Sequence, residues 1–134
     1  MAEPSPADGP RLTPDERALL ERGVAQFNAR LFYECHDTLE DLWSGLHGPA
    51  RDFVQGLIQV AVGFYHLGNG NRAGALRLFD RGLQRLAGHP AHSAGLDAAA
   101  LRDAVSAWRE AAASGGPLPA AGPPTIARAP RESA

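Results

Sequence analysis

The chain has 134 residues, enough for one domain and too few for two of typical size. Hydrophobic residues make up 44% of it and charged residues 21%, which excludes a wholly disordered chain. The formal net charge is −2, whereas general binders of nucleic acid or anionic membranes are usually basic, so we expect neither partner.

The cysteine content and the apolar stretches of the sequence indicate in which cellular compartment the protein is expected. The single cysteine, Cys35, excludes a disulfide within the chain and a zinc site built from several cysteines. Residues 1–12 carry proline and acidic residues where a signal peptide needs an apolar region. The longest apolar stretch, residues 53–67, is interrupted by polar residues and is shorter than the about 18 residues of a membrane span. We therefore expect a cytoplasmic protein without a membrane partner.

Proline marks the two ends of the chain. Most of the 11 prolines lie in the first 12 or the last 21 residues, among alanine, glycine and serine. This composition predicts disordered tails over residues 1–12 and 114–134. The remaining residues, 13–113, are expected to form one domain.

The first expected helix has a clear start. Thr13 suits the N-cap, Pro14 the first helical position and Glu16 the third, which together make a capping box. No segment has the pattern of a strand. The apolar stripe of this helix consists of Leu20, Val24, Phe27 and Leu31.

Four further helices follow, separated by short glycine- and proline-containing turns. Asn71 and Asp97 are the expected N-caps of the last two. Five helices joined by short loops predict a compact, all-α bundle of antiparallel neighbours. The four helices are expected over residues 32–46, 50–67 and 72–86 and from residue 98 onward.

The helix over residues 50–67 is apolar on nearly every side, which is typical of a helix surrounded by protein. Gly56 and Gly63 lie two turns apart on one of its faces. Each costs about 1 kcal/mol relative to alanine inside a helix. They therefore predict the close approach of a neighbouring helix.

Polar residues border the apolar face of the helix over residues 32–46. His36, Glu40 and Trp43 repeat at the spacing i, i+4, i+7, so they share one side of the helix at about 100° per residue. Asp37 and Asp41 fall on the opposite side and are expected to face solvent. His36 and Glu40 are therefore expected one turn apart, near the core.

The following helix repeats this spacing with Gln55, Gln59, Val62 and His66, at i, i+4, i+7 and i+11. An antiparallel arrangement of the two helices brings Gln59 level with His36 and Gln55 level with Glu40. If these sides face each other, a buried polar seam forms. The seam would consist of His36, Glu40, Gln55 and Gln59, between Trp43 and Tyr65.

These segments together resemble the bacterial and archaeal family known as domain of unknown function 309. The hallmark of that family, His-x-x-x-Glu-x-x-Trp/Tyr, is met by His36, Glu40 and Trp43. The resemblance spans about residues 13–87 and implies an all-helical domain with a motif suspected of binding metal. It implies no established activity. The segments that carry it are Phe27-Asn28, residues 32–43, residues 55–59, Tyr65-His66 and Gly68-Asn69.

Three interpretations of the seam remain open. In the first, it binds a divalent metal ion or a small ligand, with His36 and Glu40 as metal ligands and His66, Glu34 or Gln59 as a further one. In the second, it is a structural hydrogen-bond network. In the third, a bound metal activates water for hydrolysis. We assign no catalytic residue.

A different class of function also fits the pattern. Two helix–turn–helix pairs resemble tetratricopeptide hairpins, so the domain is alternatively a non-catalytic scaffold for a protein partner or a second copy of itself. Arg77, Arg81 and Arg85 form a stripe that suits phosphate or RNA. The acidic overall balance and the lack of interleaved aromatic residues favour a solvated face for this stripe.

Overall fold

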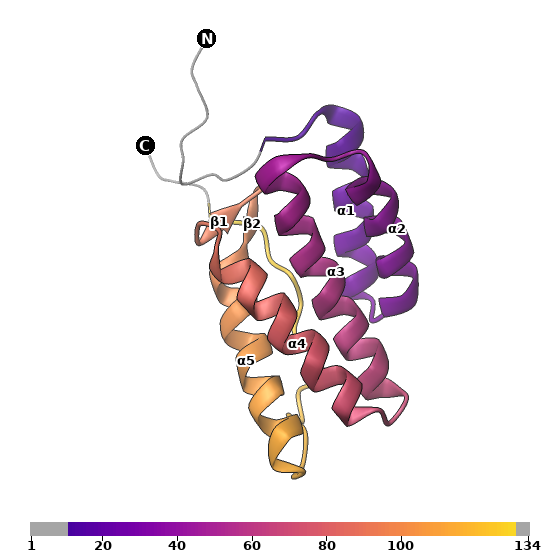
Figure 1. Ribbon diagram of the computed structural model, residues 1–134, viewed down its shortest axis with the longest axis vertical. Helices are drawn as coiled ribbons and strands as arrows, with labels where there is room; N and C mark the ends of the chain where they lie inside the picture. The colour runs from indigo at the N-terminus through magenta and orange to yellow at the C-terminus, as the bar shows by residue number, and fades with distance from the viewer. Residues whose placement is uncertain (1–10, 131–134) are drawn as a thin grey trace.

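The computed structural model describes residues 11–130, which form a bundle of five helices with one two-stranded ribbon (Figure 1). The predicted all-α bundle is thus confirmed. The remaining residues of the expected tails, 1–10 and 131–134, lie outside the described part of the chain. The elements are α1 (Pro14–Asn28), α2 (Phe32–Ser44), α3 (Gly48–Gly68), α4 (Arg72–Ala87), β1 (His92–Ser93), β2 (Leu96–Asp97) and α5 (Ala98–Ser114).

Three of the predicted helix starts are confirmed by their capping hydrogen bonds. The Thr13 side chain accepts the N–H of Glu16 at 3.2 Å, and the Glu16 carboxylate accepts the N–H of Thr13 at 2.9 Å. Asn71 and Asp97 each accept a backbone N–H from the first turn of α4 and α5. Local capping rules therefore place these three helix starts correctly.

The ribbon was not predicted. β1 and β2 pair antiparallel, with His92 opposite Asp97. Ala94 and Gly95 connect them with φ of 54° and 78°, the left-handed conformation that a tight two-residue hairpin requires. Strands of two residues are too short to show an alternating pattern in the sequence.

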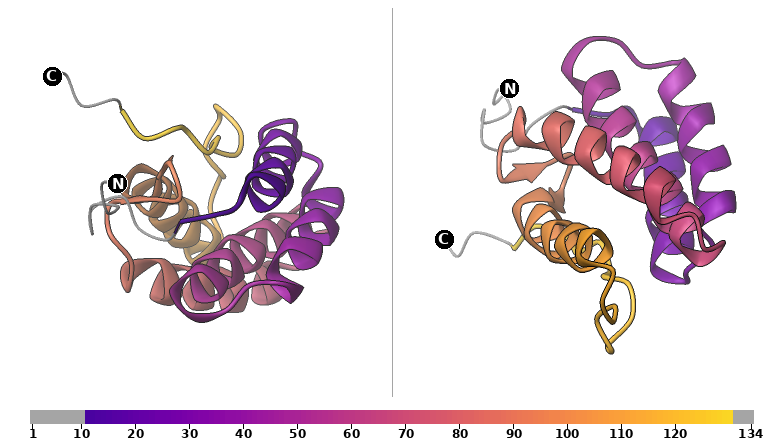
Figure 2. Two further views of the ribbon diagram at one scale, coloured as in Figure 1. Left: turned by 90° about the horizontal axis from the view of Figure 1, so that it is seen from above. Right: turned by 60° about the horizontal axis from the view of Figure 1, so that its bottom comes forward.

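α3 lies between α2 and α4 (Figures 1 and 2), as its apolar surface predicted. A Cβ atom on Gly63 would lie 2.6 Å from ring carbons of Phe79, and one on Gly56 would lie 3.0 Å from Leu86. The predicted close approach of a neighbouring helix is confirmed, and that helix is α4.

The turn between α1 and α2 differs from the prediction. α1 ends at Asn28, and Arg30 turns the chain with a positive φ of 64°. Leu31 then becomes the N-cap of α2 and is 48% exposed instead of continuing the apolar stripe. An apolar side chain is thus left at the surface beside the start of α2.

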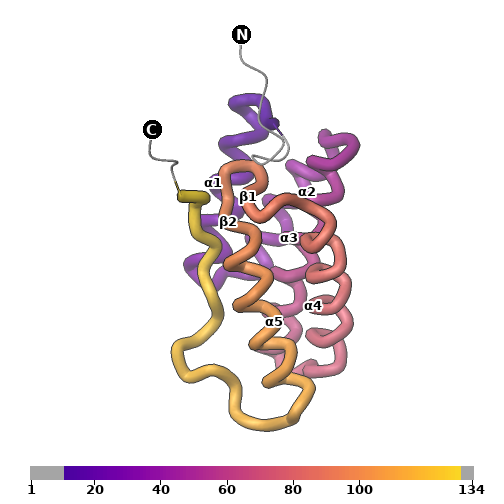
Figure 3. Tube along the Cα trace, turned by 90° about the vertical axis from the view of Figure 1, so that its left-hand side faces the viewer, coloured from indigo at the N-terminus to yellow at the C-terminus, as the bar shows by residue number. Residues whose placement is uncertain are grey.

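Residues 115–130 return along the bundle towards β2 (Figure 3), so the expectation of a disordered tail is wrong for them. The Ile126 side chain is 5% exposed. The Asp97 N–H donates to the Ala127 carbonyl at 2.9 Å. The backbones of Arg128 and Leu96 pair as an isolated antiparallel β-bridge. A segment rich in proline and alanine is ordered here because one apolar side chain and a few backbone groups find partners far away in the sequence.

Within residues 11–130, no helix combines the length and apolar character needed to cross a membrane.

Candidate functional site

His36 contacts two carboxylates of α2. Its Nε2 atom lies 3.0 Å from Oε1 of Glu40, and its Nδ1 atom lies 3.4 Å from Oδ1 of Asp37. The side chains of His36, Glu40 and Asp37 are 25%, 53% and 60% exposed. The predicted pairing of His36 with Glu40 is therefore present, but the predicted burial of Glu40 is wrong. Asp37, expected to point away, approaches the other ring nitrogen.

The two glutamines of the predicted seam lie elsewhere. Gln59 is buried, but it lines a groove between α3 and α4 together with Arg81 and Gln84. Gln55 lines a neighbouring hollow beside Trp43. The predicted seam assumed that this side of α3 faces α2. It is the approach of α4 to the glycine face of α3 that turns Gln59 towards α4.

The Trp43 ring is covered by Arg51, whose guanidinium carbon lies 3.9 Å from the ring centroid. A guanidinium over an indole face is a favourable cation–π contact. Trp43 therefore has a packing partner of its own on α3, where the sequence analysis expected it to border the seam.

The possible metal ligands also differ from the expected set. One donor atom from each of His36, Asp37 and Glu40 lies within 4.8 Å of the others. His66 is not part of this group; its ring lies beside that of Tyr65, with centroids 6.2 Å apart. One imidazole nitrogen and a carboxylate suit a divalent cation, while a second carboxylate on the other nitrogen fixes the ring.

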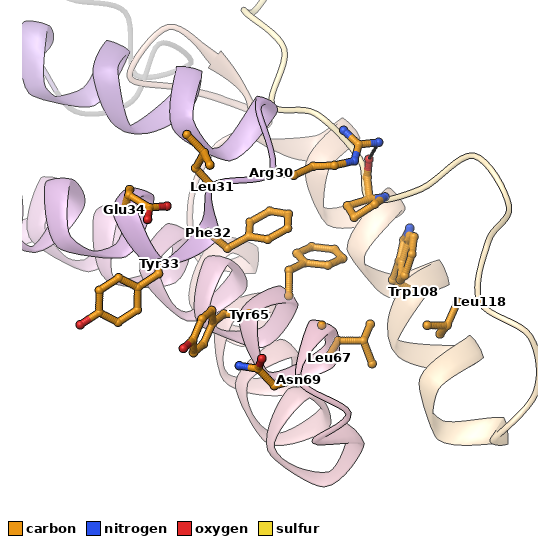
Figure 4. Close-up of a pocket in the computed structure, with 13 residues that line it drawn as sticks. Arg30, Leu31, Phe32, Tyr33, Glu34, Tyr65, Leu67, Asn69, Trp108 and Leu118 are labelled. Carbon is orange, nitrogen blue, oxygen red and sulfur yellow. Dashed lines mark hydrogen bonds between the residues drawn. The ribbon is translucent and has the colours of Figure 1, made fainter.

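An aromatic pocket of about 520 Å³ opens beside the start of α2 (Figure 4). Its apolar wall is formed by Phe32, Phe64 and Trp108, from α2, α3 and α5. The rings of Phe32 and Phe64 stack at 5.3 Å, and Trp108 meets Phe64 edge-on at 5.4 Å. Leu118 and Pro123 of the C-terminal segment also line it. Three helices and this segment therefore build one concave apolar surface.

Exposed apolar side chains gather around this pocket. Leu31, Tyr33 and Tyr65 are 48%, 50% and 40% exposed, and all three line it. The ring centroid of Tyr33 lies 5.5 Å from that of Tyr65 and 5.8 Å from that of His36. Tyr33 therefore connects the pocket with the histidine of the motif.

Sequence reasoning missed the pocket. A usable signal was present, because Phe32, Tyr33, Tyr65 and Asn69 all lie in the segments that carry the family resemblance. The opposite wall comes from α5 and from residues expected to form a disordered tail. No sequence pattern therefore indicated that these segments close the pocket.

A second polar cluster, also missed, joins α3 to α4. The Nε2 atom of His89 lies 2.8 Å from Oδ2 of Asp52, and the Arg85 guanidinium bonds the other oxygen. The hydrogen bond from His89, and then the hydrogen bond and charge of Arg85, lower the pKa of Asp52. The His89 side chain is only 7% exposed, although it follows a glycine in a loop and has no informative spacing.

Cys35 is buried in the core, and burial raises the pKa of its thiol to about 12. The thiol is therefore protonated at neutral pH and is not a nucleophile. This agrees with its position on the apolar face of α2.

Residues 20–78 match the family model described as "Domain of unknown function (DUF309)". The chain therefore resembles this family from α1 into α4, as the motifs predicted. No match was found among the curated proteins. The matched residues include the His36 cluster and most of the pocket lining, whereas Trp108, Leu118 and Pro123 lie outside them.

Proposed function

We propose that the protein is a binding module whose aromatic pocket takes a compact, largely apolar ligand that contains a ring. The observation that carries this proposal is the aromatic wall of Phe32, Phe64 and Trp108 in a cavity of about 520 Å³. Small-molecule sites commonly measure about 300–1,000 Å³ and are lined by apolar and aromatic side chains. Clustered exposed apolar side chains at the rim are also typical of binding surfaces.

Polar groups at the rim indicate one end of the ligand. Arg30 and Glu34 carry opposite charges, and Asn69 offers both a donor and an acceptor. These groups suit a ligand with one polar end that remains near solvent. Because none of the described lining residues forms a nucleophile–base pair, we assign binding and not catalysis to this pocket.

The test is a titration of isotope-labelled protein with indole, in which nuclear magnetic resonance spectra are recorded at each indole concentration. An affinity of about millimolar is expected for so small a probe. Resonances of Phe32, Tyr65, Asn69 and the Trp108 indole N–H should shift together and saturate. Asn69→Trp adds bulk at the mouth of the pocket and should abolish these shifts. Ser106→Trp, an addition at least as large on the exposed side of α5, should leave them unchanged.

Two results would overturn this proposal. One is the absence of saturable shifts at these residues. The other is an equal response of the Asn69→Trp and Ser106→Trp proteins, which would show that indole binds outside the pocket.

A divalent cation at His36 is a second candidate function, supported by the three donor atoms within 4.8 Å. Glu40 and one ring nitrogen would hold the ion, and Asp37 would fix the ring through the other nitrogen. Zn²⁺ or Ni²⁺ at about 100 times its Kd should stabilise the protein by about 2.7 kcal/mol. The stabilisation should weaken in acid, because protons compete for the imidazole. His36→Gln combined with Glu40→Gln should remove it, while Asp41→Asn should not.

The alternative of a protein-binding scaffold makes a different prediction for the same rim. A second copy of the chain that covers Leu31, Tyr33 and Tyr65 would shift their resonances as the protein concentration rises, without any probe. A cytoplasmic location stays part of the proposal, supported by the single, buried Cys35.

A further inference from the structure

A groove of about 480 Å³ lies between α3 and α4, at a different part of α3 from the aromatic pocket. Apart from one glycine, its lining residues have polar or charged side chains, and they come from α3 and from the C-terminal half and end of α4. The lining residues are Asp52, Gln59, Arg81, Gln84, Arg85 and Gly88.

The charges in this groove do not cancel. Asp52 bonds both Arg85 and His89, so the single carboxylate of the lining is already occupied. Among the described residues Arg81 forms no ion pair, and the neighbouring Asp80 binds Arg109 of α5 at 2.9 Å. One positive charge of the groove is therefore uncompensated.

The Gln59 side chain lines this groove without a hydrogen-bond partner among the described residues. The residue is 8% exposed, and its Oε1 atom has no hydrogen-bond partner within residues 11–130. Buried polar atoms without a partner are rare in folded proteins and need an explanation. The NH₂ group of the same amide also forms no hydrogen bond within residues 11–130, so its two donors are free for an acceptor bound in the groove.

We propose that this groove binds a tetrahedral oxyanion, the phosphate group of a small molecule. Arg81 supplies the uncompensated charge, and the amides of Gln59 and Gln84 supply uncharged donors. A guanidinium donates two parallel hydrogen bonds to phosphate, which favours arginine at such sites. Arg81 thus serves a site, although the arginine stripe to which it belongs was expected to be a solvated face.

Inorganic phosphate is the probe, titrated into labelled protein at constant ionic strength. The side-chain NH₂ resonances of Gln59 and Gln84 should shift and saturate. Arg81→Gln should weaken the affinity about tenfold or more, because a charge-assisted hydrogen bond is lost. Arg77→Gln removes the same charge one turn away, outside the groove, and should leave the affinity within about twofold.

The Gln59→Leu variant tests whether Gln59 takes part in phosphate binding or is only a buried amide without a hydrogen-bond partner. This variant removes the unpaired amide and keeps the volume, so it should be at least as stable as the wild type without phosphate. It should lose the rise in melting temperature that phosphate gives the wild type. Chemical shifts that change linearly with phosphate concentration, without saturation, would overturn the proposal. So would an equal loss of phosphate affinity in the Arg77→Gln and Arg81→Gln proteins. A protein that binds a polyanion such as heparin but not phosphate would also contradict it.

Discussion

The side chain of Asn28 pairs with the backbone of Ile126, a residue 98 positions later in the chain. The amide accepts the Ile126 N–H at 2.7 Å and donates to the Ile126 carbonyl at 3.1 Å. Asn28 thus satisfies both backbone groups of the residue that anchors the C-terminal segment. Because Leu118 and Pro123 of this segment line the aromatic pocket, the pair also helps to shape that pocket.

Asn28→Ala should lower the free energy of unfolding by about 1–3 kcal/mol, since it leaves two part-buried backbone groups of Ile126 without partners. Urea unfolding measures the loss, and hydrogen exchange at the Ile126 amide should accelerate. The ion pair of Glu21 with Arg128 tethers the same segment from the surface. Glu21→Ala should therefore cost at most about 1 kcal/mol. Equal losses in the two variants would contradict the anchoring role of Asn28.

The crossing of α3 and α4 should tolerate no methyl group at Gly63. A Cβ atom there would lie 2.6 Å from ring carbons of the fully buried Phe79, so Gly63→Ala is expected to cost about 1–3 kcal/mol. Gly68→Ala meets no atom within 4 Å at the end of the same helix and should be neutral or slightly stabilising. Thermal unfolding of both proteins distinguishes the two effects. A Gly63→Ala protein as stable as the Gly68→Ala protein would show that the helices can separate freely at this point.

Asp52 should make stability depend on pH. His89 and Arg85 hold the pKa of its carboxyl below the ordinary value, so the folded state binds this proton more weakly than the unfolded chain does. The stabilisation is therefore complete above the ordinary aspartate pKa of about 3.9 and is lost as pH falls through the folded-state value. Asp52→Asn should unfold at lower urea than the wild type at pH 6, and the difference should shrink below about pH 4.

The matched control is Asp41→Asn, which changes an exposed carboxyl of α2. Its difference from the wild type should be small at every pH. A gap between the wild-type and Asp52→Asn proteins that stays constant from pH 6 to pH 2.5 would rule out ionisation of Asp52 as the cause.

Local rules predicted the parts of this fold that depend on neighbours in sequence. The capping box at Thr13, the caps at Asn71 and Asp97, and the apolar face of α2 follow from residues within one or two turns. The close contact of α4 with Gly56 and Gly63 was also predicted, because glycine is unfavourable inside a helix unless a neighbouring helix needs the space.

The candidate site was less predictable, because it depends on how each helix is rotated. Helical spacing correctly placed His36 and Glu40 one turn apart, but it could not determine which neighbour the Gln59 side of α3 faces. A single residue such as Ile126 or His89 likewise gives no periodic signal, although each makes contacts far along the chain. The position of Gln59 and the contacts of Ile126 and His89 all depend on tertiary packing, which no local sequence pattern contains.

Intermolecular nuclear Overhauser effects between indole and the protein test binding in the aromatic pocket most directly. Contacts are expected from the indole ring protons to the rings of Phe32, Phe64 and Trp108, which together line this pocket. Effects confined to exposed rings such as Tyr33 and Tyr65, with none to Phe64 or Trp108, would contradict it.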